Sequence, residues 1–392
     1  MKYITRTIWI LSIVSFFTDV ASEMLYPVMP IFLESIGFSA FSIGILEGVA
    51  EATAGLSKGY FGKLSDLKGK RVPFVQVGYA LSAISKPLMI VSSFPIWIFF
   101  ARTLDRFGKG IRTGARDAIL SDESTPENKG KVFGFHRSLD TLGAVAGPAA
   151  ALLFLYFNPE QYEILFLIAF IPGTIAVFAS LLIKEKKREP KETKSRAGFL
   201  SFLSYWKESP SQYRRLVVGL LVFTLVNSSD MFLLLKAKEA GFNDTYVIGV
   251  YIFYNFIYAL FSFPLGMLAD KIGLKAVYIG GLAIFSMVYL GMAYASTIEH
   301  FFILFIGYGI FSAATEGISK AWISNISKKE DTATAIGTYT AFQSVCTMLA
   351  STTTGLIWMY FGSTQAFVFI AIVSILVAFY LVFIPKPVLQ KN

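Results

Sequence analysis

The sequence predicts an all-α membrane protein whose twelve transmembrane helices form two pseudo-symmetric six-helix bundles. Three observations predict this class. Hydrophobic residues make up 55% of the 392 residues and charged residues only 16%, whereas about a quarter of the residues in soluble domains are charged. Twelve stretches approach the roughly 20 apolar residues that a helix needs to cross a bilayer. Polar motifs of the first half also recur in the second half.

The predicted spans are separated by short loops and one long polar segment. The first span carries Asp19 and Glu23 and lacks a small-residue cleavage site, so we interpret it as a retained helix rather than a signal peptide. Lys and Arg gather in alternate loops, and the opposite loops hold only Lys236 and Lys238, which predicts cytoplasmic termini. The spans cover residues 7–33, 42–61, 72–93, 95–118, 131–157, 163–183, 213–237, 245–268, 276–296, 299–322, 333–360 and 365–385.

The long polar segment, KEKKREPKETKSRAG at 184–198, mixes both charges and shows no apolar periodicity. Such a composition is typical of a solvated linker. The sequence therefore predicts an N-terminal bundle over 1–184, a cytoplasmic linker over 185–212 and a C-terminal bundle over 213–392.

The two halves repeat each other at an offset near 204. Duplicated six-helix halves with matching polar loops indicate a transporter whose substrate site lies between the repeats. The matches are Gly62, Leu64, Asp66 and Gly69 with Gly266, Leu268, Asp270 and Gly273; Glu23-Met24 with Asp230-Met231; and Gly134 with Gly337.

The stretch GKLSDLKGKR resembles the signature G-x-x-x-D-x-x-G-[RK]-[RK] between helices 2 and 3 of the major facilitator superfamily. The second copy has Leu274 where the first basic residue would stand. LGAVAGPAAA at 142–151 resembles the Gly-x-x-x-Gly-Pro pattern of exporters in that superfamily. The resemblance implies that helices 1, 2, 4, 5, 7, 8, 10 and 11 line a central cavity and that helices 3, 6, 9 and 12 face lipid.

The loop after the second span is predicted to be a cytoplasmic gate. Glycines permit a tight reversal, and Asp66 can cap a helix N-terminus or pair with a basic residue. Such a contact would stabilise one conformation of a two-state carrier; the alternative is a positively charged loop with no switching role. The predicted gate residues are Gly62, Asp66, Gly69, Lys70, Arg71, Arg112 and Asp270.

The fourth span is unusually charged, with ARTLDRFGKGIRTGARD after an apolar start. At about 100° per residue its six charged side chains from Arg102 to Arg116 share roughly a third of the helix circumference. From Arg102 to Arg116 the helix rises about 21 Å, which is most of the hydrocarbon thickness. This stripe must therefore face protein or water rather than lipid.

Other spans also carry polar side chains, which are charged in the first half and mostly aromatic or uncharged in the second. A carboxyl group in a poorly hydrated site can bind and release a proton near neutral pH, and Asp19 and Glu51 are the predicted proton-coupling residues. The predicted substrate-binding residues are Glu23, Glu47, Arg102, Arg106, Arg137, Asp230, Tyr254, Asn255, Glu316 and Gln343.

These features predict a secondary active transporter that moves a small polar or charged solute by proton-coupled alternating access, as an exporting antiporter in a bacterial inner (plasma) membrane. The alternatives are an importer or exchanger of an anionic metabolite or metal chelate, and a non-transporting receptor. No phosphate-binding loop appears, and the single Cys346 excludes a multi-cysteine metal site. We expect no enzyme activity, cofactor, metal site or nucleic-acid partner. The expected partners are the substrate, protons and lipid around a monomer.

Overall fold

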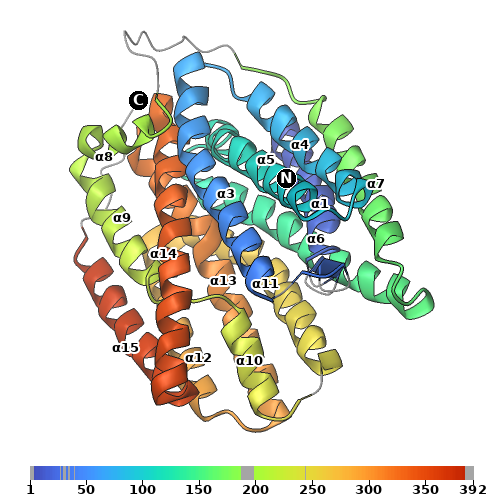
Figure 1. Ribbon diagram of the computed structural model, residues 1–392. Helices are drawn as coiled ribbons and strands as arrows, with labels where there is room; N and C mark the ends of the chain where they lie inside the picture. The colour runs from blue at the N-terminus through green and yellow to red at the C-terminus, as the bar shows by residue number, and fades with distance from the viewer. Residues whose placement is uncertain are drawn as a thin grey trace. The chain divides into compact units, whose positions relative to one another are not determined.

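The computed structural model describes residues 4–26, 28–29, 32–33, 36–38, 40–186, 198–242 and 244–384. These described residues form helices and turns and contain no strand (Figure 1). The chain divides into two compact units. The N-terminal unit comprises Met1–Glu123, Leu139–Glu208 and Lys328–Ala341, and the C-terminal unit comprises Ser124–Ser138, Ser209–Ser327 and Phe342–Asn392.

Five long helices lie wholly in the N-terminal unit, followed by a short helical segment before the second half. α4 begins at Val72 with Pro73 in its first turn, where the missing amide hydrogen of proline has no helical partner to lose. The helices are α1 (Arg6–Glu23), α3 (Ala40–Lys68), α4 (Val72–Val91), α5 (Pro95–Asp122) and α7 (Tyr162–Ser180), with η1 (Ser201–Ser204) and α8 (Tyr205–Glu208).

The C-terminal unit holds α9 (Ser211–Thr224), α10 (Met231–Glu239), α11 (Asp244–Ile272), α12 (Leu274–Tyr294), α13 (Ile298–Ile326) and α15 (Ser363–Val382). Two helices are shared between the units. The first turns of α6 (Lys129–Phe157) belong to the C-terminal unit and the first turns of α14 (Thr332–Phe361) to the N-terminal unit. The predicted bundles 1–184 and 213–392 are continuous along the chain, whereas the compact units include these short segments.

The predicted span 213–237 is not one continuous helix. α9 ends at Thr224 and α10 begins only at Met231, so the chain between them runs as turns (Figure 1). Asn227, Ser228 and Ser229 occupy this stretch. Their short polar side chains compete with helical hydrogen bonds, which explains why the apolar helix stops here.

Seven described helices are long and apolar enough to cross a membrane, namely α4, α6, α7, α12, α13, α15 and the part Gly249–Ile272 of α11. The charged α5 is not among them. α5 packs closely on α4, because a Cβ atom on Gly78 would lie 2.6 Å from the carbonyl oxygen of Gly108. This close approach brings polar groups of both helices within bonding distance.

Candidate functional site

The charged stripe of α5 is largely buried inside the N-terminal unit. Arg102, Asp105, Arg112 and Arg116 are each at most 8% exposed, whereas Lys109 is exposed. Burial of several charges is tolerated only where they are paired or hydrogen-bonded. The stripe therefore forms ion pairs with α3, α4 and α6 and a hydrogen bond from Arg116 to Ser15 of α1.

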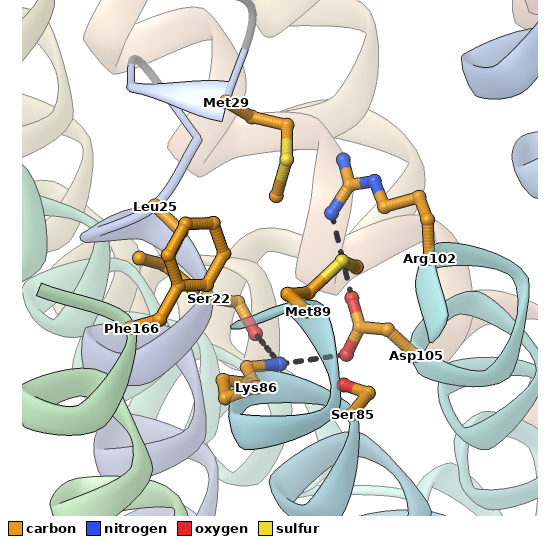
Figure 2. A pocket seen from close by; sticks show the side chains of 9 residues that line it. All are labelled: Ser22, Leu25, Met29, Ser85, Lys86, Met89, Arg102, Asp105 and Phe166. Carbon is orange, nitrogen blue, oxygen red and sulfur yellow. Dashed lines mark hydrogen bonds and ion pairs between the residues drawn. The ribbon is translucent and has the colours of Figure 1, made fainter. Parts of the chain in front are cut away.

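The deepest pairs surround a small pocket between α1, α4, α5 and α7 (Figure 2). Lys86 Nζ lies 2.7 Å from Asp105 Oδ1, and Arg102 Nη1 lies 3.6 Å from Asp105 Oδ2. Figure 2 shows Met29 and Met89 beside these charges, together with Phe166 on the other side of the pocket. The cavity volume of about 10 Å³ is roughly the room for one water molecule.

Further along α5, Arg112 and Arg116 have different partners. Arg112 donates to Ser82 Oγ at 2.6 Å, and its guanidinium carbon lies 4.6 Å from the centre of the Tyr79 ring. Arg116 pairs with the adjacent Asp117 at 2.9 Å and lies 3.9 Å from Asp140. The predicted gate residue Arg112 thus contacts Ser82 and Tyr79 of α4.

A partly exposed ion pair joins α3 and α5. Arg106 Nη1 lies 3.2 Å from Glu51 Oε1, and the Glu51 side chain is 51% exposed while the Arg106 side chain is only 12% exposed. Asp19 lies where α1 touches α6, because a Cβ atom on Gly143 would be 2.8 Å from the Cβ atom of Asp19. Glu23 is the last residue of α1. The side chain of Glu47 lies outside the described part of the structure.

In the C-terminal unit, Asp230 accepts two tyrosine hydroxyl hydrogen bonds. Tyr254 on α11 donates at 2.9 Å and Tyr308 on α13 at 2.6 Å. The close approach of α13 to α11 depends on Gly309, where a Cβ atom would lie 3.0 Å from the carbonyl oxygen of Tyr254. The structure therefore brings the predicted Asp230 and Tyr254 together and adds Tyr308.

The remaining predicted substrate-binding residues of this half divide into two kinds. Arg137 donates to the Tyr258 hydroxyl and lies 4.0 Å from Glu316, so these predicted residues form one cluster. Asn255 donates to the Tyr251 carbonyl of its own helix at 2.9 Å, which occupies one hydrogen of its amide. Gln343 is half-buried on α14.

The last turns of α3 hold the first turn of α14. Asp66 accepts hydrogen bonds from the Thr334 amide at 2.7 Å and the Thr334 hydroxyl at 2.8 Å. Arg71, which is 1% exposed, donates to Asp66 at 2.9 Å and also pairs with Asp122. A carboxylate at a helix N-terminus satisfies free amides and is favoured by the helix dipole.

Two glycines of the predicted gate lie at a close helix contact and at a turn, while the basic Lys70 is exposed. A Cβ atom on Gly62 would lie 2.5 Å from the carbonyl oxygen of Ala333, so α3 and α14 touch there. Gly69 has a φ of 63°, in the left-handed region that favours glycine. Lys70 is exposed.

The second copy of the motif repeats this arrangement inside the C-terminal unit. Asp270 accepts hydrogen bonds from the amides of Gly130 at 2.7 Å and Lys131 at 2.9 Å, at the start of α6. A Cβ atom on Gly130 would lie 2.5 Å from the carbonyl oxygen of Gly266, the counterpart of Gly62. Asp66 thus caps α14, whose first turns belong to the N-terminal unit, and Asp270 caps α6, whose first turns belong to the C-terminal unit.

Several partners were not predicted from the sequence. Tyr308 and Thr334 lie 78 and 268 residues from the acids they contact, so no local pattern identifies them. The Glu185 carboxylate accepts from the amides of Arg71 and Val72 and thereby caps α4. An acid just after an apolar span was the only available signal for this contact.

Comparison with known proteins agrees with this architecture. A sequence profile described as Major Facilitator Superfamily matches residues 11–256 and 235–392. The chain is 33% identical over 389 residues to the uncharacterized MFS-type transporter MJ1317 of Methanocaldococcus jannaschii, covering 98% of this chain and 96% of that one. It is 22% identical over 362 residues to a multi-drug resistance efflux pump PmrA homolog of Lactococcus lactis, covering 89% and 86% of the two chains.

Two solved structures share the fold. The Escherichia coli fucose:proton symporter FucP superposes with a TM-score of 0.81 at 12% identity, covering 98% of this chain and 100% of that one. The human organic anion transporter MFSD10 (TETRAN) gives a TM-score of 0.79 at 15% identity, covering 96% and 99%. These likenesses confirm the predicted all-α, twelve-helix membrane fold. The chain therefore belongs to the Major Facilitator Superfamily.

Proposed function

We propose that this transporter exports a small polar or charged solute by proton-coupled alternating access, as an antiporter. Its place is a bacterial inner (plasma) membrane, where it works as a monomer with both termini cytoplasmic. Asp19 and Glu51 carry the proton, and the predicted polar residues of both halves contact the substrate.

The observation that carries the proposal is the Glu51–Arg106 pair. The carboxylate is half exposed while its guanidinium partner is largely buried, at a separation of 3.2 Å. A proton that binds Glu51 neutralises the acid and weakens its attraction to Arg106. Arg106 then becomes available to a substrate, so proton binding and substrate binding use the same cation in alternation.

The Asp66 and Asp270 contacts are proposed to act as the gate. Each holds the N-terminus of a long helix through backbone hydrogen bonds that two conformations can make or break. Rupture of the Asp66 contact also requires Arg71 to rearrange, because this arginine is almost fully buried. The gate therefore favours two discrete states over a continuum.

Two named relatives support parts of the proposal. The efflux pump name of the Lactococcus lactis relative supports export. The name of the fucose:proton symporter indicates that a chain of this fold uses protons.

Everted membrane vesicles provide the test. The vesicles are given an imposed pH gradient, and ethidium and a library of drugs, sugars and organic acids are screened for gradient-driven accumulation. Glu51→Gln and Asp19→Asn should each abolish accumulation, while Glu299→Gln, an exposed acid on α13, should leave it unchanged. Retained transport in both Glu51→Gln and Asp19→Asn would refute the proton-coupling assignment.

A second candidate, import or exchange of an organic anion, is favoured by one observation. The cluster of Lys86, Arg102 and Asp105 carries two cations for one carboxylate beside a pocket. The anion transporter name of the human structure points the same way. Uptake of radiolabelled organic acids in right-side-out vesicles, without accumulation in everted ones, would support this candidate over export.

A further inference from the structure

In the C-terminal unit, Asp230 stands at the break between α9 and α10 and does not cap the helix that follows it. Asp230 stands at the N-cap position of α10, yet its side chain makes no capping hydrogen bond. Instead both carboxylate oxygens point to tyrosines, Oδ2 to Tyr254 and Oδ1 to Tyr308. The carboxylate is thus turned away from its own helix and toward α11 and α13.

No described residue forms an ion pair with Asp230, so its charge is met only by neutral hydroxyl donors. This distinguishes it from Glu51 and Asp105, which each lie beside a cation. The further charged group that acts on Asp230 is another acid, Glu316. An anion would be repelled at this position, whereas a cation would be attracted.

The turn that leads into Asp230 supplies further oxygen atoms. The amide oxygen of Asn227 and the hydroxyl oxygen of Ser228 are both buried without a hydrogen-bond partner, and Ser228 is only 3% exposed. The hydroxyl of Tyr289 on α12 lies close to Ser228 and Tyr308. Buried polar atoms are ordinarily satisfied, so these oxygens, two and three residues before Asp230 in the same turn, call for a donor or a cation.

The helix geometry supplies one more attraction. α9 ends at Thr224, and the negative end of its dipole faces the turn. Interrupted membrane helices use such carbonyl ends and unwound backbone to hold monovalent cations. A divalent ion is a poorer fit, because Ca²⁺ and Mg²⁺ prefer several carboxylates or extensive hydration.

We propose that the break between α9 and α10 is a binding site for a monovalent cation, with Asp230 as the charged ligand and the oxygens of Asn227 and Ser228 as neutral ligands. The cation is an alkali metal ion or the ammonium group of a solute, since both present one positive charge to oxygen atoms. This site is separate from the proton-coupling acids of the proposed function. Its occupancy does not depend on transport.

Thermal unfolding of the purified full-length chain in detergent tests the site. Sodium chloride, potassium chloride and methylammonium chloride are titrated separately, each against tetraethylammonium chloride, a bulky cation without an N–H group, to hold the ionic strength constant. At least one of the three cations should raise the unfolding midpoint by about 2 °C in a saturable manner. A response to metal ions alone or to methylammonium alone identifies the source of the cation.

Asp230→Asn should abolish this saturable response, and Glu299→Gln should retain it. Ser228→Ala keeps the charge and should weaken the apparent affinity at least about threefold, which preserves the test if Asp230→Asn fails to fold. No saturable response in the unmodified chain, or the same response in Asp230→Asn, would overturn the proposal. Because the measurement needs no transport, the vesicle assay with Glu51→Gln can fail or succeed independently of it.

Discussion

The ion cluster around Asp105 yields a prediction in which two substitutions of one ion pair differ strongly in effect. Asp105 lies 2.7 Å from Lys86 and 3.6 Å from Arg102, and all three side chains are less than 10% exposed. Among the described residues, these two contacts join two cations to one anion. Lys86→Met leaves one cation with one anion, whereas Asp105→Asn leaves two buried cations.

The distances set the magnitudes. With an effective dielectric constant near 20, the Coulomb attraction is about 6 kcal/mol at 2.7 Å and about 5 kcal/mol at 3.6 Å, before desolvation is subtracted. Removal of one partner of a buried pair usually costs about 3–5 kcal/mol. We expect Asp105→Asn to reach this range. Lys86→Met should cost about 1 kcal/mol, because the remaining pair stays neutral and an ammonium group no longer has to be desolvated.

Thermal unfolding in detergent measures the difference. Asp105→Asn should lower the unfolding midpoint by about 10 °C and Lys86→Met by about 3 °C, at roughly 3 °C per kcal/mol. Lys109→Met removes an exposed lysine from the same helix and should change the midpoint by less than about 1 °C. Equal losses for Lys86→Met and Asp105→Asn would contradict the charge count on which the reasoning rests.

Three further predictions follow from other contacts. Burial raises the pKa of Asp66, which lies beyond the predicted span 42–61, to about 6 although Arg71 lies beside it. The folded state then binds the proton more tightly than the unfolded state. The free energy of unfolding should therefore fall by about 3 kcal/mol as the pH rises from about 4 to about 6, and stay level above that. Unfolding midpoints measured across this pH range should show the decrease, and Asp66→Asn should remove it. Gly266→Val would force side-chain atoms against the Gly130 carbonyl and should lower the free energy of unfolding by about 1–3 kcal/mol. Gly280→Val on α12, where a Cβ atom meets nothing within 4 Å, is the control and should be nearly neutral in the same unfolding assay. Gly309→Val should separate Tyr308 from Tyr254. In the cation titration described above, it should weaken the apparent affinity for the cation at least about threefold. An unchanged affinity would show that the site does not require the close approach of α11 and α13.

The fold class was predictable because its signals are local and repeated. Apolar length identifies spans, and the 100° helical period places Arg102 and Asp105 on one face before any coordinates exist. The break before Asp230 was missed for a physical reason. A window of about 20 residues averages the turn at 225–230 with its apolar neighbours, so hydropathy does not register six residues that leave the helix.

The candidate site was predictable only in part, because the identities of charged residues do not reveal their partners. Lys86 stands on a helix expected to face lipid, yet it is 4% exposed and bound to Asp105. Arg112, which is predicted to belong to the gate, donates to Ser82 and lies over the ring of Tyr79, both on α4. Such pairings depend on tertiary packing, in which side chains far apart in sequence choose among several nearby charges.

Asp66 caps α14 and Asp270 caps α6, and the two caps differ in which substitutions around them they tolerate. Asp270 is held by main-chain amides, which every residue except proline supplies, so substitution at position 131 leaves the hydrogen bonds intact, whereas position 130 requires glycine because a Cβ atom there would lie 2.5 Å from the Gly266 carbonyl oxygen. Asp66 depends additionally on Arg71, whose buried charge in turn needs Asp122. At the matching positions of the second loop, Leu274 stands in place of the exposed Lys70, while Lys275 keeps a basic residue in place of Arg71, so the basic residue that is absent is the one that takes no part in the Asp66 cap.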